Sequence, residues 1–254
     1  MIGHRGLGRG RVDGLMENSA GSVAAAVALG LPWVEVDVRR TADDALVVSH
    51  GPLTPRGRDI TACTIGEAMD HGMSRLEDVL AVIPLDVGVV LDVKTSLADA
   101  LRPLARTTGA LTIPIAREQV RQRPCMVYGF DPSVLLVFRD LAPEVPLGML
   151  TWVDFPFRKA VPAAVHLGAQ VVAAHTGSFL GNRIEPRFGP GDVSEAVEVA
   201  HRAGLDVVAW CPTSQDAPLL VAAGVDALCV NDVPSMLDRL TRSGVPIALT
   251  GRQV

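Results

Sequence analysis

The sequence has few aromatic residues and no closely spaced cysteines. Aromatic side chains make up only 4% of the 254 residues, so a surface that stacks nucleic-acid bases is not expected. The formal net charge of −5 also argues against a nucleic-acid partner, because such partners require basic surfaces. The cysteines form neither a CxxC redox pair nor a zinc knuckle. We expect reduced, buried thiols at Cys63, Cys125, Cys211 and Cys229.

The sequence also lacks a long apolar run. The longest stretch without Asp, Glu, Lys or Arg is 160–182, and prolines, glycines and histidines interrupt it. No stable membrane insertion is therefore expected. The first residues include Arg5, Arg9 and Arg11 instead of the apolar segment of a signal peptide. We expect a cytoplasmic protein, and the sequence does not predict its oligomeric state.

Short apolar runs alternate with helical patterns along the chain. Hydrophobic residues make up 48% and charged residues 20% of the sequence, which excludes disorder. The alternation predicts a single-domain (β/α)8 TIM barrel over residues 1–254, with an open doubly wound sheet as the alternative. The glycines after His4 lack the GxGxxG spacing of a dinucleotide site. The expected strands are Ile2–His4, Val34–Val38, Val89–Val93, Cys125–Gly129, Pro146–Leu150, Gln170–Ala174, Asp206–Trp210 and Ala227–Val230.

Several helix ends can be read from local motifs. Ser19–Leu29 ends at a glycine, and Ser74 has capping-box spacing to Glu77, which predicts a helix through about Val82. Asp131 and Pro132 look like an N-cap followed by proline at the first helical position. A small loop insertion after the second strand, Leu53–Gly72, is expected to lie over the barrel mouth. Further helices are expected at Ser194–Ala203 and Asp216–Ala223.

Two acidic residues interrupt the second apolar run. Glu35 and Asp37 alternate with valines, and residues two apart on a strand point to the same face. Inside a barrel, two uncompensated carboxylates would repel each other and lose hydration, and a divalent cation would relieve both effects. Oxygen ligands suit Mg²⁺ or Ca²⁺, with Mn²⁺ as a third candidate. An edge strand with both acids in solvent is the alternative that the alternation leaves open.

The third run repeats this pattern with Asp92 and Lys94. Asp92 is a candidate third metal ligand, and Lys94 is a candidate ligand of a phosphate oxygen. The alternative is a simple ion pair at a strand end. Two such motifs on two predicted strands make that alternative the weaker one.

Two histidines are the acid–base candidates. His4 and His50 each follow an apolar run, and imidazole exchanges protons near neutral pH. Arg5, next to His4, offers a planar set of donors for a phosphate group. A lone histidine is more often structural than catalytic. The assignment of His4 and His50 as acid and base therefore depends on the carboxylates and cations that are expected near them.

The polar motifs follow one another in a specific order over nearly the whole chain. A His-Arg-Gly strand end comes first, the Glu17-Asn18 pair precedes the first helix, and Asp232-Val233-Pro234 closes the series. In this order the sequence resembles the glycerophosphodiester phosphodiesterase family. The resemblance implies a (β/α)8 barrel with one divalent cation and a small-molecule phosphodiester substrate. It also implies hydrolysis of glycerophosphodiesters to glycerol 3-phosphate and an alcohol by histidine acid–base catalysis.

The resemblance also suggests roles for three further residues. Glu17 and Asn18 would bind the metal shell or the substrate, although Asn18 could instead cap the first helix. Trp210 would stack on the glycerol or alcohol part of the substrate, and the alternative is an apolar plug at the barrel rim.

The sequence departs from the family pattern at several positions. Asp92 stands where the family usually has Glu, Gly51 stands where an Asp follows the second histidine, and Gly129 replaces a serine. Two alternatives therefore stay open. One is a non-catalytic barrel that binds phosphodiesters. The other is phospholipase D-type action on lysophospholipids, which would need an apolar entrance beside Leu53–Gly72 and Trp152–Phe157.

Overall fold

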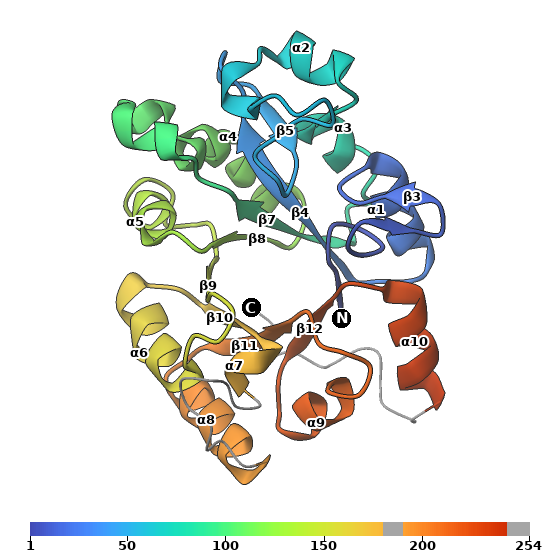
Figure 1. The fold of residues 1–254 in the computed structure, drawn as a ribbon. Coiled ribbons are helices and arrows are strands. Elements are labelled where there is room, and N and C mark those ends of the chain that lie inside the picture. Colours follow the sequence, from blue (N-terminus) through green and yellow to red (C-terminus); the bar gives the residue numbers. More distant parts are fainter. Residues whose placement is uncertain (180–189, 243–254) are drawn as a thin grey trace.

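A computed structural model describes residues 1–179 and 190–242 of the chain. Eight parallel strands form a closed barrel, because β1 pairs with both β4 and β12 (Figure 1). This closure confirms the predicted (β/α)8 barrel and excludes the open sheet. The strands are β1 (Ile2–Gly3), β4 (Trp33–Arg40), β7 (Gly88–Val93), β8 (Cys125–Gly129), β9 (Leu147–Leu150), β10 (Val171–His175), β11 (Asp206–Trp210) and β12 (Ala227–Val230).

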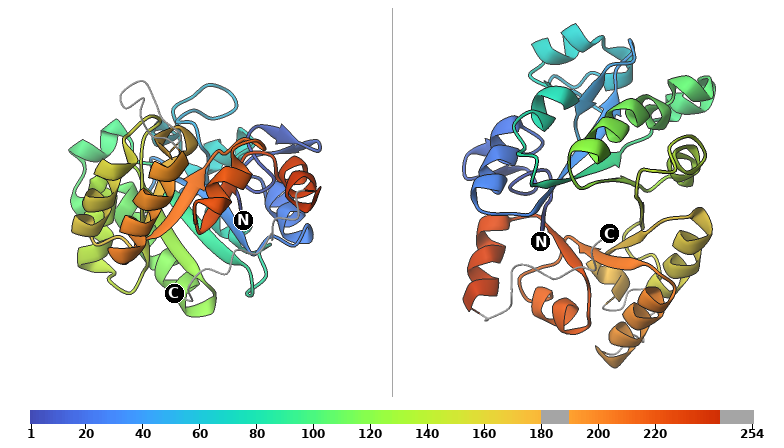
Figure 2. Two further views of the ribbon diagram at one scale, coloured as in Figure 1. Left: turned by 90° about the horizontal axis from the view of Figure 1, so that it is seen from below. Right: turned by 180° about the vertical axis from the view of Figure 1, so that it is seen from behind.

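Helices surround the barrel and cover the outer faces of its strands (Figures 1 and 2). None of the helices in the described part of the chain combines the length and the apolarity needed to cross a membrane. The helices are α1 (Ala20–Ala28), α2 (Ile65–Asp70), α3 (Leu76–Leu80), α4 (Thr108–Gln122), α5 (Pro132–Leu141), α6 (Phe157–Leu167), α7 (Thr176–Phe179), α8 (Pro190–Arg202), α9 (Ala217–Ala222) and α10 (Val233–Arg242).

Alternation of side chains along the strands separates two apolar regions. Val34, Val36 and Val38 on β4 point outward into the main core against the helices. Residues on the other face, such as Val90 of β7 and Tyr128 of β8, fill the barrel interior. The interior-facing positions next to them along β4 and β7 carry the carboxylates. The near-continuous apolar runs therefore reflect strands that are buried on both faces.

The segment between β4 and β7 departs from the expected boundaries. Strand β5 (Leu46–Val48) pairs antiparallel with β4, and β6 (Ser74–Arg75) pairs with β5. Because Ser74 lies in this strand, it does not cap the next helix, so the predicted capping box at Ser74 is wrong. A capping box does occur at the start of α2, between Thr64 and Glu67.

The insertion is more ordered than expected. Leu53–Gly72 was expected to be a loop over the barrel mouth, but it contains a 3₁₀ turn (Ile60–Ala62) and α2. In Figures 1 and 2 it projects outward from the barrel, beyond β5. Its own small core, around Ile60 and Cys63, stabilises it there. A short hairpin of β2 (Arg11–Val12) and β3 (Leu15–Met16) precedes α1.

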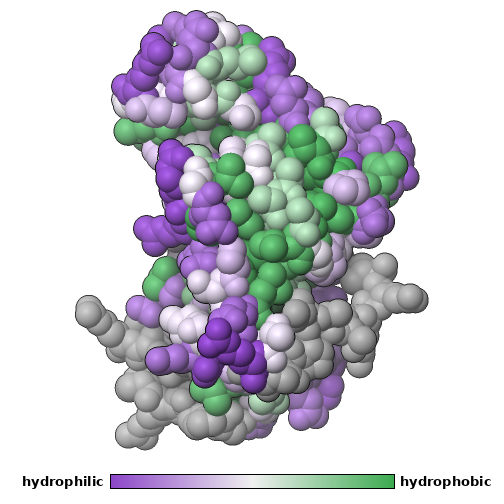
Figure 3. Space-filling view, turned by 90° about the vertical axis from the view of Figure 1, so that its right-hand side faces the viewer, coloured by the Kyte–Doolittle hydropathy of each residue, from purple (hydrophilic) through white to green (hydrophobic). Residues whose placement is uncertain are grey.

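One side of the molecule has an apolar surface. Figure 3 views the side that carries α1 and α10 in Figure 1, and shows apolar residues across its middle between polar areas. Helix α1 contributes to this because Ala20–Ala28 contains no charged residue.

Candidate active site

The polar residues singled out in the sequence meet at the carboxyl ends of β1, β4 and β7. This is the end of a (β/α)8 barrel where catalytic groups are found. His4 and Arg5 follow β1, and Lys94 follows β7. The barrel therefore brings together residues that are about 90 positions apart in the sequence.

Three carboxylates form the centre of the site. Glu35 and Asp37 are 2% and 0% exposed, and Asp92 is 5% exposed. Asp37 and Asp92 are direct neighbours in the pairing of β4 with β7. One oxygen of each carboxylate lies within 4.8 Å of the others. The acids thus point into the barrel, and the alternative of an edge strand with solvated acids is wrong.

Burial and mutual repulsion disfavour three negative charges here. Burial, and then the charges of Asp37 and Asp92, raise the pKa of Glu35 well above its usual value. Burial also raises the pKa of Asp92 to about 6, despite its ion pair with Lys94. For Asp37, burial is outweighed by Lys94 and Arg5, which lower its pKa. Arg5 and Lys94 therefore do not fully compensate the negative charge of the three carboxylates.

Lys94 bridges two of the carboxylates. Its Nζ lies 3.0 Å from Asp37 Oδ1 and makes a short contact with Asp92 Oδ2. It also lies 4.9 Å from the centre of the Phe130 ring. The neighbouring carboxylates raise its pKa against the effect of burial, so the side chain is an ammonium at neutral pH.

A strained turn holds Arg5 beside the cluster. Arg5 has a φ of 57°, in the left-handed region that non-glycine residues rarely adopt. Its backbone N–H donates to Glu35 Oε2 at 2.8 Å, and its guanidinium contacts Glu17 at 2.9 Å and Asp37 at 3.2 Å. Gly6 follows with a φ of 90°, and a Cβ there would meet Ser22 Oγ at 2.6 Å. Observed strain of this kind often marks a functional position.

Asn18 contacts the acidic cluster instead of capping α1. Its Nδ2 donates to Asp37 Oδ2 at 2.8 Å, and its Oδ1 accepts the backbone N–H of Asp37 at 3.1 Å. The cap of α1 is Ser19, whose hydroxyl accepts the N–H of Ser22. The suggested alternative role of Asn18 as a helix cap is therefore wrong.

His4 is held by a residue that sequence reasoning did not select. Its Nδ1 lies 2.6 Å from Asn231 Oδ1, and its Nε2 lies 3.8 Å from Glu35 Oε2. Cys211 Sγ is 3.7 Å from the same Nδ1. Burial, together with the charge of Arg5, lowers the pKa of His4 to about 4. The ring is therefore neutral at pH 7, with the Nδ1 proton donated to Asn231. Asn231 directly precedes the Asp232-Val233-Pro234 motif, which was its only sequence signal.

His50 lies at the edge of the site and is exposed. Its backbone carbonyl accepts hydrogen bonds from Arg39 Nε and Nη2, at 3.2 and 2.7 Å. Its ring is close enough to Asp37, Arg5 and Lys94 for their charges to act on it, although partial burial is the main cause that lowers its pKa.

Aromatic residues line one side of the site. Phe130 lies 4.7 Å from Trp152 and 5.8 Å from Trp210, measured between ring centres. Trp210 also packs against His175 at 4.5 Å. Trp210, Phe130 and Trp152 thus form an aromatic row at the rim, and Phe130 connects this row to Lys94. The sequence singles out Trp152 only as part of the segment beside an apolar entrance, and it does not single out Phe130, because contacts between the ends of different strands leave no local pattern.

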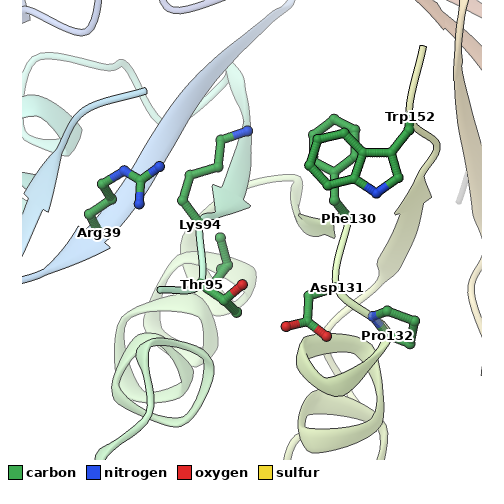
Figure 4. Close-up of a pocket in the computed structure, with 8 residues that line it drawn as sticks. Arg39, Lys94, Thr95, Phe130, Asp131, Pro132 and Trp152 are labelled. Carbon is green, nitrogen blue, oxygen red and sulfur yellow. The ribbon is translucent and has the colours of Figure 1, made fainter. Parts of the chain in front are cut away.

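Two hollows that share lining residues lie at this end of the barrel, and Lys94 lines the first of them. The first has a volume of about 390 Å³ and lies between the ends of β4, β7, β8 and β9 (Figure 4). The second, of about 730 Å³, shares Thr95 and Asp131 with it, and its lining combines apolar residues with polar ones that include Asp99 and Arg102. Of the two segments expected to border an apolar entrance, Trp152–Phe157 contributes Trp152 to the first hollow, and no residue of Leu53–Gly72 lines either of these two hollows. The apolar residues that line the second hollow are Leu97, Ala100, Leu104, Val134 and Val137.

Comparisons with known proteins agree with this geometry. The model of the glycerophosphoryl diester phosphodiesterase family matches residues 4–235. This match confirms the resemblance seen in the ordered motifs. Among curated proteins, no relative matches the chain.

Solved structures share the fold. A protein from Silicibacter pomeroyi DSS-3 has a TM-score of 0.76 and 20% identity, over 98% of this chain and 94% of that chain. A glycerophosphodiester phosphodiesterase from Parabacteroides distasonis ATCC 8503 has a TM-score of 0.75 and 18% identity, over 96% and 97%. An Oleispira antarctica phosphodiesterase in complex with the product sn-glycerol-3-phosphate has a TM-score of 0.72 and 19% identity, over 94% and 96%.

Proposed function

Because the chain belongs to the glycerophosphoryl diester phosphodiesterase family and is therefore a phosphoric diester hydrolase, we propose that it hydrolyses glycerophosphodiesters with one divalent cation. The products are glycerol 3-phosphate and an alcohol. The observation that carries this proposal is the buried cluster of three carboxylates beside an arginine, a lysine and a neutral histidine.

The donor atoms of the cluster fit a hard divalent cation. Among the described residues, Glu35 Oε1 and Asp92 Oδ1 are buried without a hydrogen-bond partner, and such atoms are costly unless something binds them. Asp37 completes a set of carboxylate oxygens, which suits Mg²⁺, Ca²⁺ or Mn²⁺. When bound, the cation supplies Lewis-acid stabilisation of the negative charge on the phosphoryl group.

Arg5 and Lys94 bind the phosphate group of the substrate. Arg5 is fixed by Glu17 and by its own backbone contact to Glu35, so its orientation is set before the substrate arrives. Lys94 adds a second positive charge from the β7 side. Donors that are already in position stabilise charge that develops in the transition state without reorganising.

The two histidines exchange protons with the reacting oxygens. His4 is neutral, and the contact of Nδ1 with Asn231 leaves Nε2 free to accept the proton of the attacking hydroxyl. His50 is exposed and in contact with solvent, so it can take up a proton from water, and its imidazolium form would then protonate the leaving alkoxide and return to the neutral ring. The attacking hydroxyl is either water or the glycerol 2-hydroxyl, which would give a cyclic phosphate that water then opens.

A metal-depletion experiment tests this proposal. The purified protein is treated with EDTA, and Mg²⁺, Ca²⁺ or Mn²⁺ is then added back with glycerophosphocholine or glycerophosphoethanolamine as substrate. We expect release of glycerol 3-phosphate only with an added cation, and none from the Glu35→Gln variant. Full activity after thorough chelation would contradict the cation. Binding of both diesters without turnover under every condition would identify a non-catalytic barrel.

A second candidate function is phospholipase D-type action on lysophospholipids. The observation that favours it is the second hollow, of about 730 Å³, whose lining is partly apolar. Leu97 and Leu101 near this hollow are 93% and 91% exposed, which is unusual for side chains of this size. An assay of lysophosphatidylcholine beside glycerophosphocholine decides between the two substrates.

A further inference from the structure

The first hollow beside Lys94 has a mixed lining. Figure 4 shows the Phe130 and Trp152 rings side by side at one wall of it, tilted by 33° to each other, with Arg39 across from them and Asp131 below. The hollow therefore combines an aromatic wall with a cation, an anion and a hydroxyl. The lining residues besides Lys94 are Arg39, Val93, Thr95, Phe130, Asp131, Pro132 and Trp152.

Polar atoms in this lining are available to a ligand. Arg39 uses Nε and Nη2 for the His50 carbonyl, and its Nη1 has no hydrogen bond to any described residue. Asp131 uses Oδ1 to cap α5 through the N–H of Ser133 at 2.9 Å, and its Oδ2 is likewise unused among the described residues. Thr95 adds a hydroxyl group between them.

The aromatic wall is also available. Trp152 is 67% exposed although it is the largest type of side chain. Phe130 already contacts Lys94 and Trp152, so Trp152 provides the free ring surface at the rim. An exposed aromatic at the edge of a hollow is typical of a ligand-binding surface.

The chemistry of the lining favours one class of ligand. A quaternary ammonium group has no hydrogen-bonding hydroxyl, so it would leave Arg39 Nη1 and the Thr95 hydroxyl without a partner, and it would lie close to the Arg39 cation. An acyl chain fits poorly because charged groups lie on two of its sides. A cyclic polyol has an apolar C–H face that can cover an aromatic ring. Its peripheral hydroxyls both donate and accept, which matches Asp131, Thr95 and Arg39. A linear glycerol has no such flat apolar face.

We propose that this hollow binds the alcohol part of the substrate when that alcohol is a cyclic polyol, such as inositol or a hexose. This inference rests on the proposed function, since Lys94 links the hollow to the phosphate position. The ring stacks on Trp152, and its hydroxyls bind Asp131, Thr95 and Arg39. The adjoining second hollow leaves room for substituents on the ring.

The test compares three deacylated diesters with the cation-loaded protein: glycerophosphoinositol, glycerophosphocholine and glycerophosphoethanolamine. We expect kcat/KM for the inositol ester to exceed that for the other two by about tenfold or more. Trp152→Ala should lower the inositol value by about tenfold and the ethanolamine value by less than about twofold. Val153→Ala is the matched control, because Val153 is also exposed (55%) but lies outside the lining.

A second variant separates hydroxyl binding from ammonium binding. Asp131→Ser keeps a residue that can cap α5 but removes the carboxylate oxygen that is free for a ligand. We expect it to lower kcat/KM for the inositol ester by about tenfold. A selective loss with the ethanolamine or choline ester instead would overturn the polyol assignment.

The remaining outcomes distinguish failure of the polyol subsite from failure of the proposed function. Rates for the three diesters within about twofold of each other, or an equal loss for all three in Trp152→Ala, would refute the polyol subsite and leave the proposed function intact. Hydrolysis of none of the three would refute the proposed function, and the subsite with it.

Discussion

Replacing Asp92 by asparagine should stabilise the metal-free protein. Burial raises the pKa of Asp92 from its ordinary value of 3.8 to about 6, so the folded state favours the protonated form. This carboxyl group therefore costs almost no stability below pH 3.8; its cost grows as the pH rises from 3.8 to about 6 and stays constant above that. Each pKa unit corresponds to about 1.4 kcal/mol, so the full cost at pH 8 is about 3 kcal/mol. Asparagine has nearly the same shape without the charge.

Urea denaturation in EDTA measures this effect. At pH 8, we expect Asp92→Asn to have a free energy of unfolding about 3 kcal/mol higher than the original protein, with little difference at pH 4. Asp238→Asn is a control at an exposed carboxylate and should change stability by less than about 0.5 kcal/mol. A variant that is less stable than the original protein in EDTA at pH 8 would refute this account of the cluster.

The same pair of proteins tests the metal site. A cation at about 100 times its Kd should stabilise the original protein by about 2.7 kcal/mol. Asp92→Asn should gain much less, because a ligand is lost. An equal gain in both proteins would show that the cation binds elsewhere.

Three further predictions concern the histidines. His4→Ala and His50→Ala should each lower kcat by about 100-fold or more, and near-full activity in either variant, with circular dichroism confirming the fold, would remove that residue from the mechanism. The pKa of His4 is about 4 in the fold against 6.5 ordinarily, so this residue alone should lower the free energy of unfolding by about 3 kcal/mol as the pH falls from 6.5 to 4. Protonation of Asp92 acts in the opposite direction over this range, so the loss is measured as the difference between the original protein and His4→Gln. His4→Gln should escape that loss, and parallel urea curves at both pH values would contradict the assignment. Asn231→Ala should lower kcat more than it changes KM, because it removes the oxygen that holds the His4 ring. Its kinetics are compared with those of Asn231→Asp, which keeps an acceptor oxygen at this position.

Much of the fold could be predicted because the barrel strands are buried on both faces. Their apolar runs are continuous, and each strand limit lies within two residues of the expected one. The error at Ser74 has a physical cause. Its capping-box spacing is a local signal, and pairing of Ser74 with Val48 of β5 overrides it. Long-range strand pairing of this kind leaves no local pattern in a single sequence.

The acidic cluster could be predicted because strand alternation fixes which side chains share a face. Its other contacts could not. Asn231 meets His4 across 227 positions of sequence, and the aromatic row joins side chains from the ends of neighbouring strands. The sequence singles out Asn18 but not its contact with Asp37. That contact is seen only in the fold, where Ser19 caps α1 and the Asn18 side chain is available to Asp37.

The charges of the site link cation binding to substrate binding. Glu17, Glu35, Asp37 and Asp92 face two cations, Arg5 and Lys94, which leaves two negative charges in excess when all four acids are ionised. Burial first, and then the charges of Asp37 and Asp92, raise the pKa of Glu35. One divalent cation cancels the excess of negative charge, and only then does an anionic phosphodiester meet a site without net repulsion. We therefore expect KM for the diester to rise several-fold as free Mg²⁺ is lowered below its Kd. A KM that is constant while only the maximal rate falls would show that the substrate binds independently of the cation.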